Sequence, residues 1–469
     1  MTERVTILDA KDRFKKGGGG EKKTTAPAFS EDAIALRFTE IHGDDLRYVA
    51  PWGKWLIWDG QRWAFDSTVA VFGLARAVCR EEAARCKKKG TGQKIASAKT
   101  RAAVENLARA DRRHAAIIDQ WDADPWLLNT PSGTVDLRTD EIRPHRREDY
   151  CTKVTAIAPG GDCPKWLEFL KQITGGDDEL QEFLKRVAGY GLTGLTREHA
   201  LFFAYGTGAN GKSVFLNTLA GALGDYHKTA PMETFIASHT DRHPTELAAL
   251  RGARLVTATE IEEGRRWAES KIKALTGGDP ISARFMRQDF FEFIPQFKLL
   301  IAGNHKPRLR NVDEAIRRRL HLLPFSITIP PDERDDRLAE KLKEEWPGIL
   351  AWAIEGAAEW GMMGLRPPEA VRAATEQYLE AEDTLVRWVE ECCHQGANFA
   401  ATAGDLYRTW KTWCDNSGEY AGSQKRFTQN LEARGYARVR VGAASIRGFR
   451  GLRPKAQEYR PEEVREDLL

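Results

Sequence analysis

The 469-residue chain lacks the features that mark secreted, membrane-spanning and zinc-ribbon proteins. Its seven cysteines are scattered and include no CxxC pair, which argues against a disulfide framework and against a structural zinc site. No apolar run of about 18 residues occurs, and the first residues lack the apolar core of a signal peptide. We therefore expect a cytoplasmic protein that has no membrane partner.

A large net charge is also missing, because 71 Lys and Arg residues are balanced by 68 Asp and Glu residues. A chain of this length exceeds a single hydrophobic core, so several domains are expected. Lysine and glycine are abundant in residues 1–30, which predicts a disordered basic tail. Aromatic strands around an Asp-Gly turn, near residues 55–63, and a second hairpin near residues 127–137 predict an α+β domain over residues 31–160.

A glycine-rich motif follows the apolar strand predicted at residues 201–205 and precedes a predicted helix. It matches the P-loop pattern GxxxxGK[ST], whose backbone N–H groups surround phosphate oxygens. The alternative is a glycine-rich turn that matches by chance, but the flanking strand and helix argue against it. We therefore predict binding of ATP with Mg²⁺, in which Lys212 contacts the β and γ phosphates and Ser213 ligates the metal. The predicted loop comprises Gly206, Thr207, Gly208, Ala209, Asn210, Gly211, Lys212 and Ser213.

Two further apolar strands end in polar residues that suit nucleotide hydrolysis. The first, at residues 254–260, ends in Glu260, which we assign to the metal or to the attacking water. Glu262 and Glu263 are alternatives, although a solvated acidic turn explains them as well. The second strand, at residues 297–304, ends in Asn304, where an amide can sense the γ-phosphate; an Asn turn before a proline is the alternative.

Arginines and a hairpin occupy the remainder of the predicted ATPase region, residues 161–330. Arg317, Arg318 and Arg319 precede a strand, and either they supply an arginine finger to a neighbouring subunit or they stabilise a helix end. Residues 282–293 alternate as a hairpin whose turn carries Arg287. In a ring this arginine faces single-stranded DNA in the central channel; an exposed loop arginine is the alternative.

The C-terminal region carries most of the excess positive charge, with 12 basic and 5 acidic residues between 401 and 460. Two amphipathic helices precede a predicted β-wing, which is the layout of a winged helix over residues 381–456. We predict DNA contacts from Lys425 and Arg426 on the second helix and from Arg447 and Arg450 on the wing. A winged helix used for protein contacts is the alternative. A helical connector is predicted at residues 331–380 and a charged tail at residues 457–469.

From about residue 177 to residue 325 the chain resembles the superfamily 3 helicase domain of phage, plasmid and poxvirus primase–helicases. The P-loop, the acidic strand, the strand ending in Asn304 and the paired Arg318 and Arg319 carry this resemblance. It implies an α/β fold with an AAA+-like core and a hexameric ring on single-stranded and forked DNA. It also places Lys271, Lys273 and Arg284 in a matched stretch, to which we assign DNA contacts. The family has a tryptophan where this chain has Arg317, so all three arginines stay open as the finger.

The combined expectation is an ATP-dependent DNA helicase of a phage or mobile element. Too few residues precede Asp32 for a primase domain, so a separate primase or polymerase is expected as partner. A replication initiator that uses ATP only for assembly is one alternative, and processive strand displacement separates the two. A P-loop kinase is another, and it predicts ATP turnover that ignores DNA.

Overall fold

The computed structural model describes residues 26–237, 245–259, 263–286, 289–310, 312–442 and 445–455. The chain divides into two compact units, which we call the N-terminal unit (Met1–Ala123 with His145–Thr152) and the C-terminal unit (Asp124–Pro144 with Lys153–Leu469). The sequence predicted a boundary at residue 160, between the α+β domain and the ATPase region. The structure differs because the hairpin at residues 127–136 packs into the C-terminal unit, where Leu128 and Val135 join its main core.

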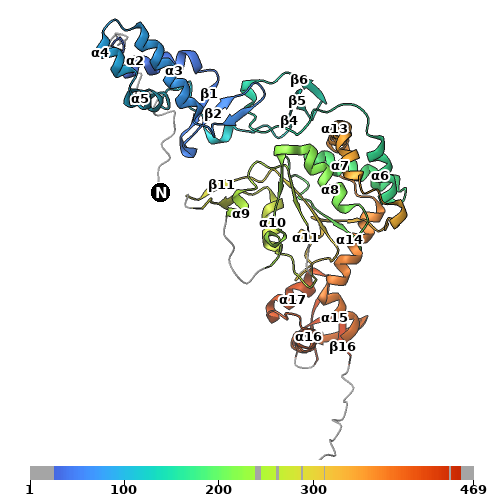
Figure 1. Ribbon diagram of the computed structural model, residues 1–469. Coiled ribbons are helices and arrows are strands. Elements are labelled where there is room, and N and C mark those ends of the chain that lie inside the picture. Colours follow the sequence, from blue (N-terminus) through green and yellow to red (C-terminus); the bar gives the residue numbers. More distant parts are fainter. Residues whose placement is uncertain are drawn as a thin grey trace, which may run out of the picture. The chain divides into compact units, whose positions relative to one another are not determined.

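The N-terminal unit combines a three-stranded antiparallel sheet with helices (Figure 1). The hairpin predicted around Asp59-Gly60 is present, with Trp58 paired to Trp63. Three helices follow this hairpin in the sequence. The elements are α2 (Glu31–His42), β1 (Leu46–Val49), η1 (Ala50–Trp52), β2 (Lys54–Trp58), β3 (Trp63–Phe65), α3 (Ala70–Arg85), α4 (Lys89–Ile95), α5 (Ala98–Ala108), η2 (Ile118–Gln120) and η3 (Arg147–Asp149).

The C-terminal unit is built on a five-stranded sheet in the order β13-β7-β12-β9-β8, and every neighbouring pair is parallel. The strands are β7 (Leu201–Tyr205), β8 (His227–Thr229), β9 (Leu255–Ala258), β12 (Lys298–Gly303) and β13 (Leu320–Pro324). Alternate residues of β7 face two different cores: Phe202 packs in one and Phe203 in the other. Parallel sheets need both faces covered, and here both faces are.

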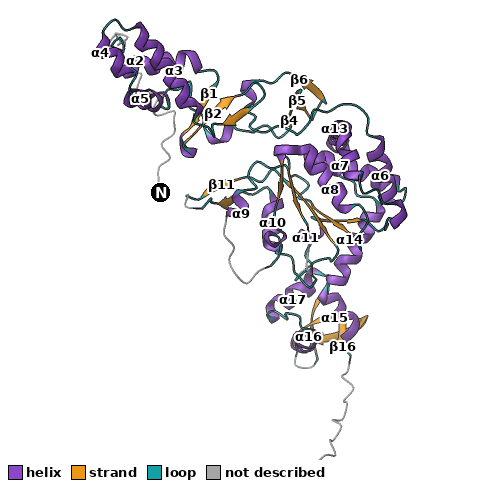
Figure 2. Cartoon of the chain, viewed as in Figure 1, coloured by secondary structure: helices purple, strands orange, loops and turns teal. Residues whose placement is uncertain are grey.

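Helices cover the two faces of this sheet (Figure 2). The first layer consists of α6 (Pro164–Thr174), α7 (Asp178–Leu192), α8 (Lys212–Leu223) and α13 (Trp346–Met363), and the second includes α9 (Thr245–Ala248), α10 (Glu269–Gly277), α11 (Glu314–Arg317) and much of α14 (Glu369–Glu382). Residues 331–380 were predicted to be a connector, but α13 and α14 bury their apolar residues in the two cores. The short elements η4 (Gly224–Tyr226), η5 (Met232–Thr234), η6 (Pro331–Glu333) and α12 (Leu338–Glu344) join these layers.

Two glycines separate helices α6 and α7. Gly175 and Gly176 adopt positive φ angles of 64° and 81°, which end α6 in the left-handed conformation that glycine tolerates. The Asp177 carboxylate then accepts a hydrogen bond of 2.9 Å from the Leu180 N–H and caps α7. This break allows α6 to turn back under the glycine-rich loop described below.

The C-terminal subdomain, residues 384–454, has a core of its own. Its elements run in the order helix, strand, helix, helix, strand, strand, and the sheet order is β14-β16-β15. They are α15 (Thr384–Cys392), β14 (Cys393–Thr402), α16 (Ala403–Ser417), α17 (Gln424–Ala433), β15 (Arg438–Val441) and β16 (Ile446–Pro454). The two smaller sheets of the C-terminal unit are β4 (Leu127–Thr130), β5 (Gly133–Asp136) and β6 (Glu141–Arg143), and β10 (Ile281–Ala283) with β11 (Phe291–Phe293). No helix among the described residues has the length and apolarity to cross a membrane.

Candidate active site

The glycine-rich loop connects the end of β7 with the start of α8, as the motif predicted. A Cβ atom at Gly206 would lie 2.0 Å from the Asn210 side chain and 2.1 Å from the Phe325 carbonyl, so only glycine fits there. Gly211 has φ of 80° and a Cβ atom would lie 2.5 Å from Ile173 of α6. The loop therefore curls tightly over α6, and the N-terminus of α8 opens onto it. This is the arrangement that presents backbone N–H groups to phosphate oxygens.

Lys212 is buried at the first position of α8 and its ammonium group is held inside the loop. Nζ donates to the Gly206 carbonyl at 2.8 Å, to Asn210 Oδ1 at 2.9 Å and to Asn304 Oδ1 at 3.2 Å. These three oxygens belong to neutral groups, and burial lowers the pKa of Lys212. No carboxylate among the described residues pairs with this ammonium group.

Strand register explains why Asn304 reaches Lys212. Strand β12 lies next to β7 in parallel, with Gly303 opposite Tyr205, so both chains leave the sheet at the same edge. Strand β9 lies on the other side of β12 and ends at Ala258 along this edge. Glu260, the predicted catalytic acid, follows two residues later and lies outside the described residues, as does Glu262. The described Glu263 is exposed.

Asn210 is a contributor whose role sequence reasoning missed. Its side-chain amide donates to the Phe325 carbonyl at 2.9 Å, and the Ile329 N–H donates to the Ala209 carbonyl at 2.8 Å. The chain after β13 is therefore tied to the loop from outside the motif. Because Asn210 Oδ1 also accepts from Lys212, one side chain joins the loop, the lysine and the neighbouring segment. Asparagine within a P-loop pattern carries no signal of this role.

Lys306 is a second missed residue at this edge. Its ammonium group lies 3.9 Å from the ring centroid of Tyr205, the last residue of β7. Burial lowers the pKa of Lys306. Its position two residues after Asn304 was the available signal. Besides the buried Lys212, the half-buried Lys306 is therefore a second cation beside the loop.

Two residues of the loop that carry hydroxyl groups are exposed. Ser213 and Thr207 are exposed, and Ser213 lies in the first turn of α8. No group of three or more His, Cys, Asp or Glu residues suited to a metal occurs in the part of the chain that the structure describes. The Ser213 hydroxyl, an oxygen ligand of the kind that Mg²⁺ prefers, fits a metal that keeps most of its ligands from substrate and water.

The three arginines before β13 differ sharply in their surroundings. Arg317 donates to Glu376 at 2.6 Å, whereas Arg319 is buried and donates to Thr276 Oγ1 at 3.2 Å and to the Ala315 carbonyl at 2.9 Å. Burial and the neighbouring Arg318 lower the pKa of Arg319. Arg318 alone among the three is exposed and has no hydrogen bond or ion pair with a described residue. The predicted pair is thus one structural arginine and one free arginine.

The hairpin predicted at residues 282–293 is present as β10 and β11, with Ala283 opposite Phe291. Arg287, at its turn, lies outside the described residues. Arg284 is half-buried with its guanidinium 4.6 Å from the Phe290 ring centroid. Met286 and Phe290 are exposed, so the described part of the turn is apolar as well as basic.

The other predicted DNA contacts are mostly exposed. Lys273 is the exception, because it is paired with Asp313 at the N-terminus of α11. Lys271, in the same helix, is half-buried and has no hydrogen bond or ion pair with a described residue. The four predicted contacts of the C-terminal subdomain, all exposed, are Lys425, Arg426, Arg447 and Arg450.

Comparison with known proteins finds two family models that match parts of the chain. A domain model described as D5 N terminal like matches residues 35–175, and a family of unknown function (DUF5906) matches residues 204–319. A fold comparison pairs the chain with the NrS-1 C terminal region at 10% sequence identity and a TM-score of 0.49, covering 90% of this chain and 100% of that one.

The curated relatives are proteins of large DNA viruses that bear the name "putative helicase". One from Acanthamoeba polyphaga mimivirus is 26% identical over 321 residues, covering 62% of this chain and 33% of the relative. One from Frog virus 3 (isolate Goorha) is 25% identical over 280 residues, covering 54% and 28%. The chain thus spans a third or less of the length of these relatives. Over part of its length the chain is thus similar to a D5-type domain and to putative helicases of large DNA viruses.

Proposed function

We propose that the chain is an ATP-dependent DNA helicase with a P-loop AAA+-like core of the superfamily 3 type, active as a ring, with six subunits as the expected number. The observation that carries this proposal is the 3.2 Å contact between Lys212 Nζ and Asn304 Oδ1. It brings a P-loop cation and the polar end of the neighbouring parallel strand to one point. A γ-phosphate placed there would touch both, so hydrolysis would be sensed directly by β12.

Each residue at this edge has a distinct task. Lys212 neutralises the β and γ phosphates, and the N–H groups from Gly206 to Ser213 orient them. Asn304 hydrogen-bonds the γ-phosphate, and Glu260 polarises the attacking water or holds the metal through water. Ser213 would hold Mg²⁺, which supplies charge neutralisation when bound.

Arg318 is the residue we propose as the arginine finger. Strand β13 runs parallel to β7 with Leu320 opposite Leu201, so Arg318 lies at the edge of the sheet where β7 begins. The glycine-rich loop lies at the other edge, about 17 Å away for a five-residue strand. Arg318 therefore cannot serve its own nucleotide without a large rearrangement, and it suits a neighbour's nucleotide in a ring.

DNA binding rests on two surfaces of the C-terminal unit. The sequence of the hairpin formed by β10 and β11 includes Arg284 and Arg287, and Lys271 lies in α10, which precedes it. The exposed Phe290 of this hairpin is suited to contact with bases. The C-terminal subdomain has the element order of a winged helix, and we propose that α17 and the turn between β15 and β16 bind DNA through phosphates. Lys273 is withdrawn as a DNA contact because Asp313 already pairs with it. A primase or polymerase would act as a separate partner, in the cytoplasm.

Strand displacement on a forked duplex tests the proposed function. We expect displacement that requires ATP and Mg²⁺, and ATP turnover that rises on addition of single-stranded DNA. DNA binding and ATP-dependent assembly without displacement would favour a replication initiator, a role that the exposed cations of α17 and β16 also suit. Turnover indifferent to DNA would favour a P-loop kinase and would overturn the proposal.

Glu260→Gln should abolish ATP turnover while ATP binding persists, because the substitution removes a carboxylate and leaves the loop intact. Trapped rings should accumulate in ATP, which sedimentation velocity can measure. Glu233→Gln is the matched control, since this exposed acid of η5 is not among the candidate catalytic residues. Retained turnover in the Glu260 variant, combined with loss in the Glu262→Gln variant, would move the catalytic role to Glu262.

A further inference from the structure

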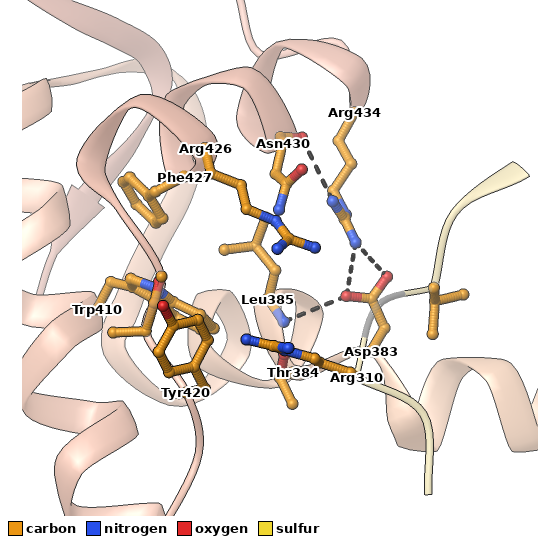
Figure 3. A pocket seen from close by; sticks show the side chains of 13 residues that line it. Arg310, Asp383, Thr384, Leu385, Trp410, Tyr420, Arg426, Phe427, Asn430 and Arg434 are labelled. Carbon is orange, nitrogen blue, oxygen red and sulfur yellow. Dashed lines mark hydrogen bonds and ion pairs between the residues drawn. The ribbon is translucent and has the colours of Figure 1, made fainter. Parts of the chain in front are cut away.

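A pocket lies where the chain segment after β12 meets the C-terminal subdomain. Figure 3 shows the guanidinium groups of Arg310 and Arg426 directed into it, from the segment after β12 and from α17 respectively. Tyr420, Asn430 and Thr384 also line it. We call it the Arg310–Arg426 pocket.

The pocket carries uncompensated positive charge. Its buried carboxylate, Asp383, is paired with Arg434 through two hydrogen bonds of 2.7 and 2.6 Å and also caps α15. Two nearby acids have other partners: Glu419 pairs with Arg266, and Glu382 accepts the Leu309 N–H at 2.8 Å. Neither Arg310 nor Arg426 makes a guanidinium hydrogen bond or ion pair with any residue in the described ranges. Among the described residues, these two positive charges therefore face a shared space without a carboxylate partner of their own.

Arg426 is placed where a helix disfavours a cation. Ser423 caps α17 by accepting the Arg426 N–H at 3.3 Å, so Arg426 lies in the first turn, where the helix macrodipole is positive. Lys425 precedes it, and the first turn contains no acidic residue. An anion bound here would relieve both the dipole and the repulsion between the arginines.

Arg310 approaches the pocket from the ATPase core and is held firmly. Its backbone N–H donates to Glu269 at 2.6 Å, and its guanidinium carbon lies 4.4 Å from the Tyr420 ring centroid. The same segment is fixed further back by a hydrogen bond from the Tyr378 hydroxyl to the Pro307 carbonyl. It begins at Asn304, six residues before Arg310. One short segment thus connects the γ-phosphate site with the pocket.

We propose that the Arg310–Arg426 pocket binds one phosphodiester group of nucleic acid, gripped jointly by the two guanidinium groups with Asn430 as a further donor. Planar, always charged guanidinium groups match phosphate oxygens, and a phosphate supplies the missing anion. This inference rests on the proposed DNA function and extends it. The backbone of DNA bound in this pocket would contact both the segment that begins at Asn304 and the C-terminal subdomain. The ATPase core and the subdomain would therefore bind the same strand.

The test is the salt dependence of binding, measured by anisotropy of a labelled single-stranded oligonucleotide. Arg310→Ala and Arg426→Ala should each weaken binding about tenfold, and the double variant should lose less than the product of the two, because they share one ligand. The slope of log K against log salt should become shallower by about 0.7 in the double variant, the value for one phosphate on a single strand. Arg408→Ala is the matched control, since this exposed arginine lies on α16 and pairs with Asp405.

The outcomes separate the possible ligands. Wild-type affinity and slope in the double variant would show that the pocket is not a DNA site. In that case, a melting temperature that inorganic phosphate raises in the wild type but not in the double variant would show that the pocket binds free phosphate instead. If the salt-dependence slope became shallower by about 1.4, the two arginines would bind two separate phosphates, which would contradict joint binding of one phosphate. The Arg310→Lys and Arg426→Lys variants guard against misfolding, because they should keep the slope while losing affinity. Failure of the wild type itself to bind DNA rejects the proposed function together with this inference.

Discussion

Lys212→Ala is expected to reduce ATP turnover by about 10² to 10³, the loss typical for removing one preorganised charge from a developing anion. The effect is large because Lys212 supplies the positive charge of the loop, and its three hydrogen-bond partners among the described residues are neutral groups that cannot replace that charge. Strand displacement should disappear with turnover. Steady-state phosphate release, with and without DNA, is the measurement.

The variant should still fold, which makes the loss interpretable. Lys212 leaves behind three oxygens, of which the one on the exposed Asn304 can be solvated by water, and such a loss costs about 1–2 kcal/mol of folding free energy. Lys228→Ala is the matched control, because Lys228 is an exposed lysine of β8 in the same sheet. If Lys212→Ala kept more than about a tenth of wild-type turnover, the phosphates would not bind at this loop.

Most of the central sheet was predictable because its strands are short apolar runs that end in recognisable polar residues. The strands β7, β9 and β12 lie within two residues of the predicted limits, and β13 follows the three arginines as predicted. Strand β8 was missed because its three residues, His227–Thr229, are polar or half-exposed at the sheet edge. Strand β14 was missed for a similar reason, since most of its side chains are exposed.

Packing partners were harder to predict than elements. The sequence of α13 indicates a helix but does not indicate which face of the sheet the helix covers. Residues 331–380 were therefore predicted to be a connector. Trp360 is in fact fully buried in the core against α7, where its ring lies 4.5 Å from that of Tyr190. Long-range packing of this kind depends on how two distant segments meet, and a local pattern cannot encode it.

The candidate site likewise combines features that the local sequence predicts with features that depend on the fold. The motif alone predicts that Lys212 faces phosphate, since the pattern is local. The contact between Lys212 and Asn304 needed the strand order, because 92 positions separate the two residues in sequence. The choice among the three arginines needed burial and bonding, because neighbouring residues of one type look equivalent in a sequence.

Arg318→Ala should reduce ATP turnover about 10³-fold or more, which is the range measured for arginine fingers. Arg318 is exposed and has no partner among the described residues, whereas Arg319 is bonded to Thr276 within its own subunit. Arg319→Ala should instead lower the melting temperature, because it leaves a hole in a buried contact. A loss of turnover in the Arg318 variant with an unchanged melting temperature would therefore indicate a chemical role.

Mixing subunits decides whether that role acts between neighbours. Arg318→Ala subunits have an intact P-loop, and Lys212→Ala subunits have an intact finger, so mixed rings recreate complete sites at some interfaces. For random one-to-one mixing, about a quarter of the interfaces pair an intact loop with an intact finger, and recovered turnover should approach that share of wild type. Lys212→Ala mixed with the control Arg372→Ala, an exposed arginine of α14 paired with Glu369, should show turnover from every Arg372→Ala subunit. If the first mixture recovers nothing while labelled subunits are seen to share rings, Arg318 acts on its own subunit, and the geometry that places it at the far edge of the sheet must change when ATP binds.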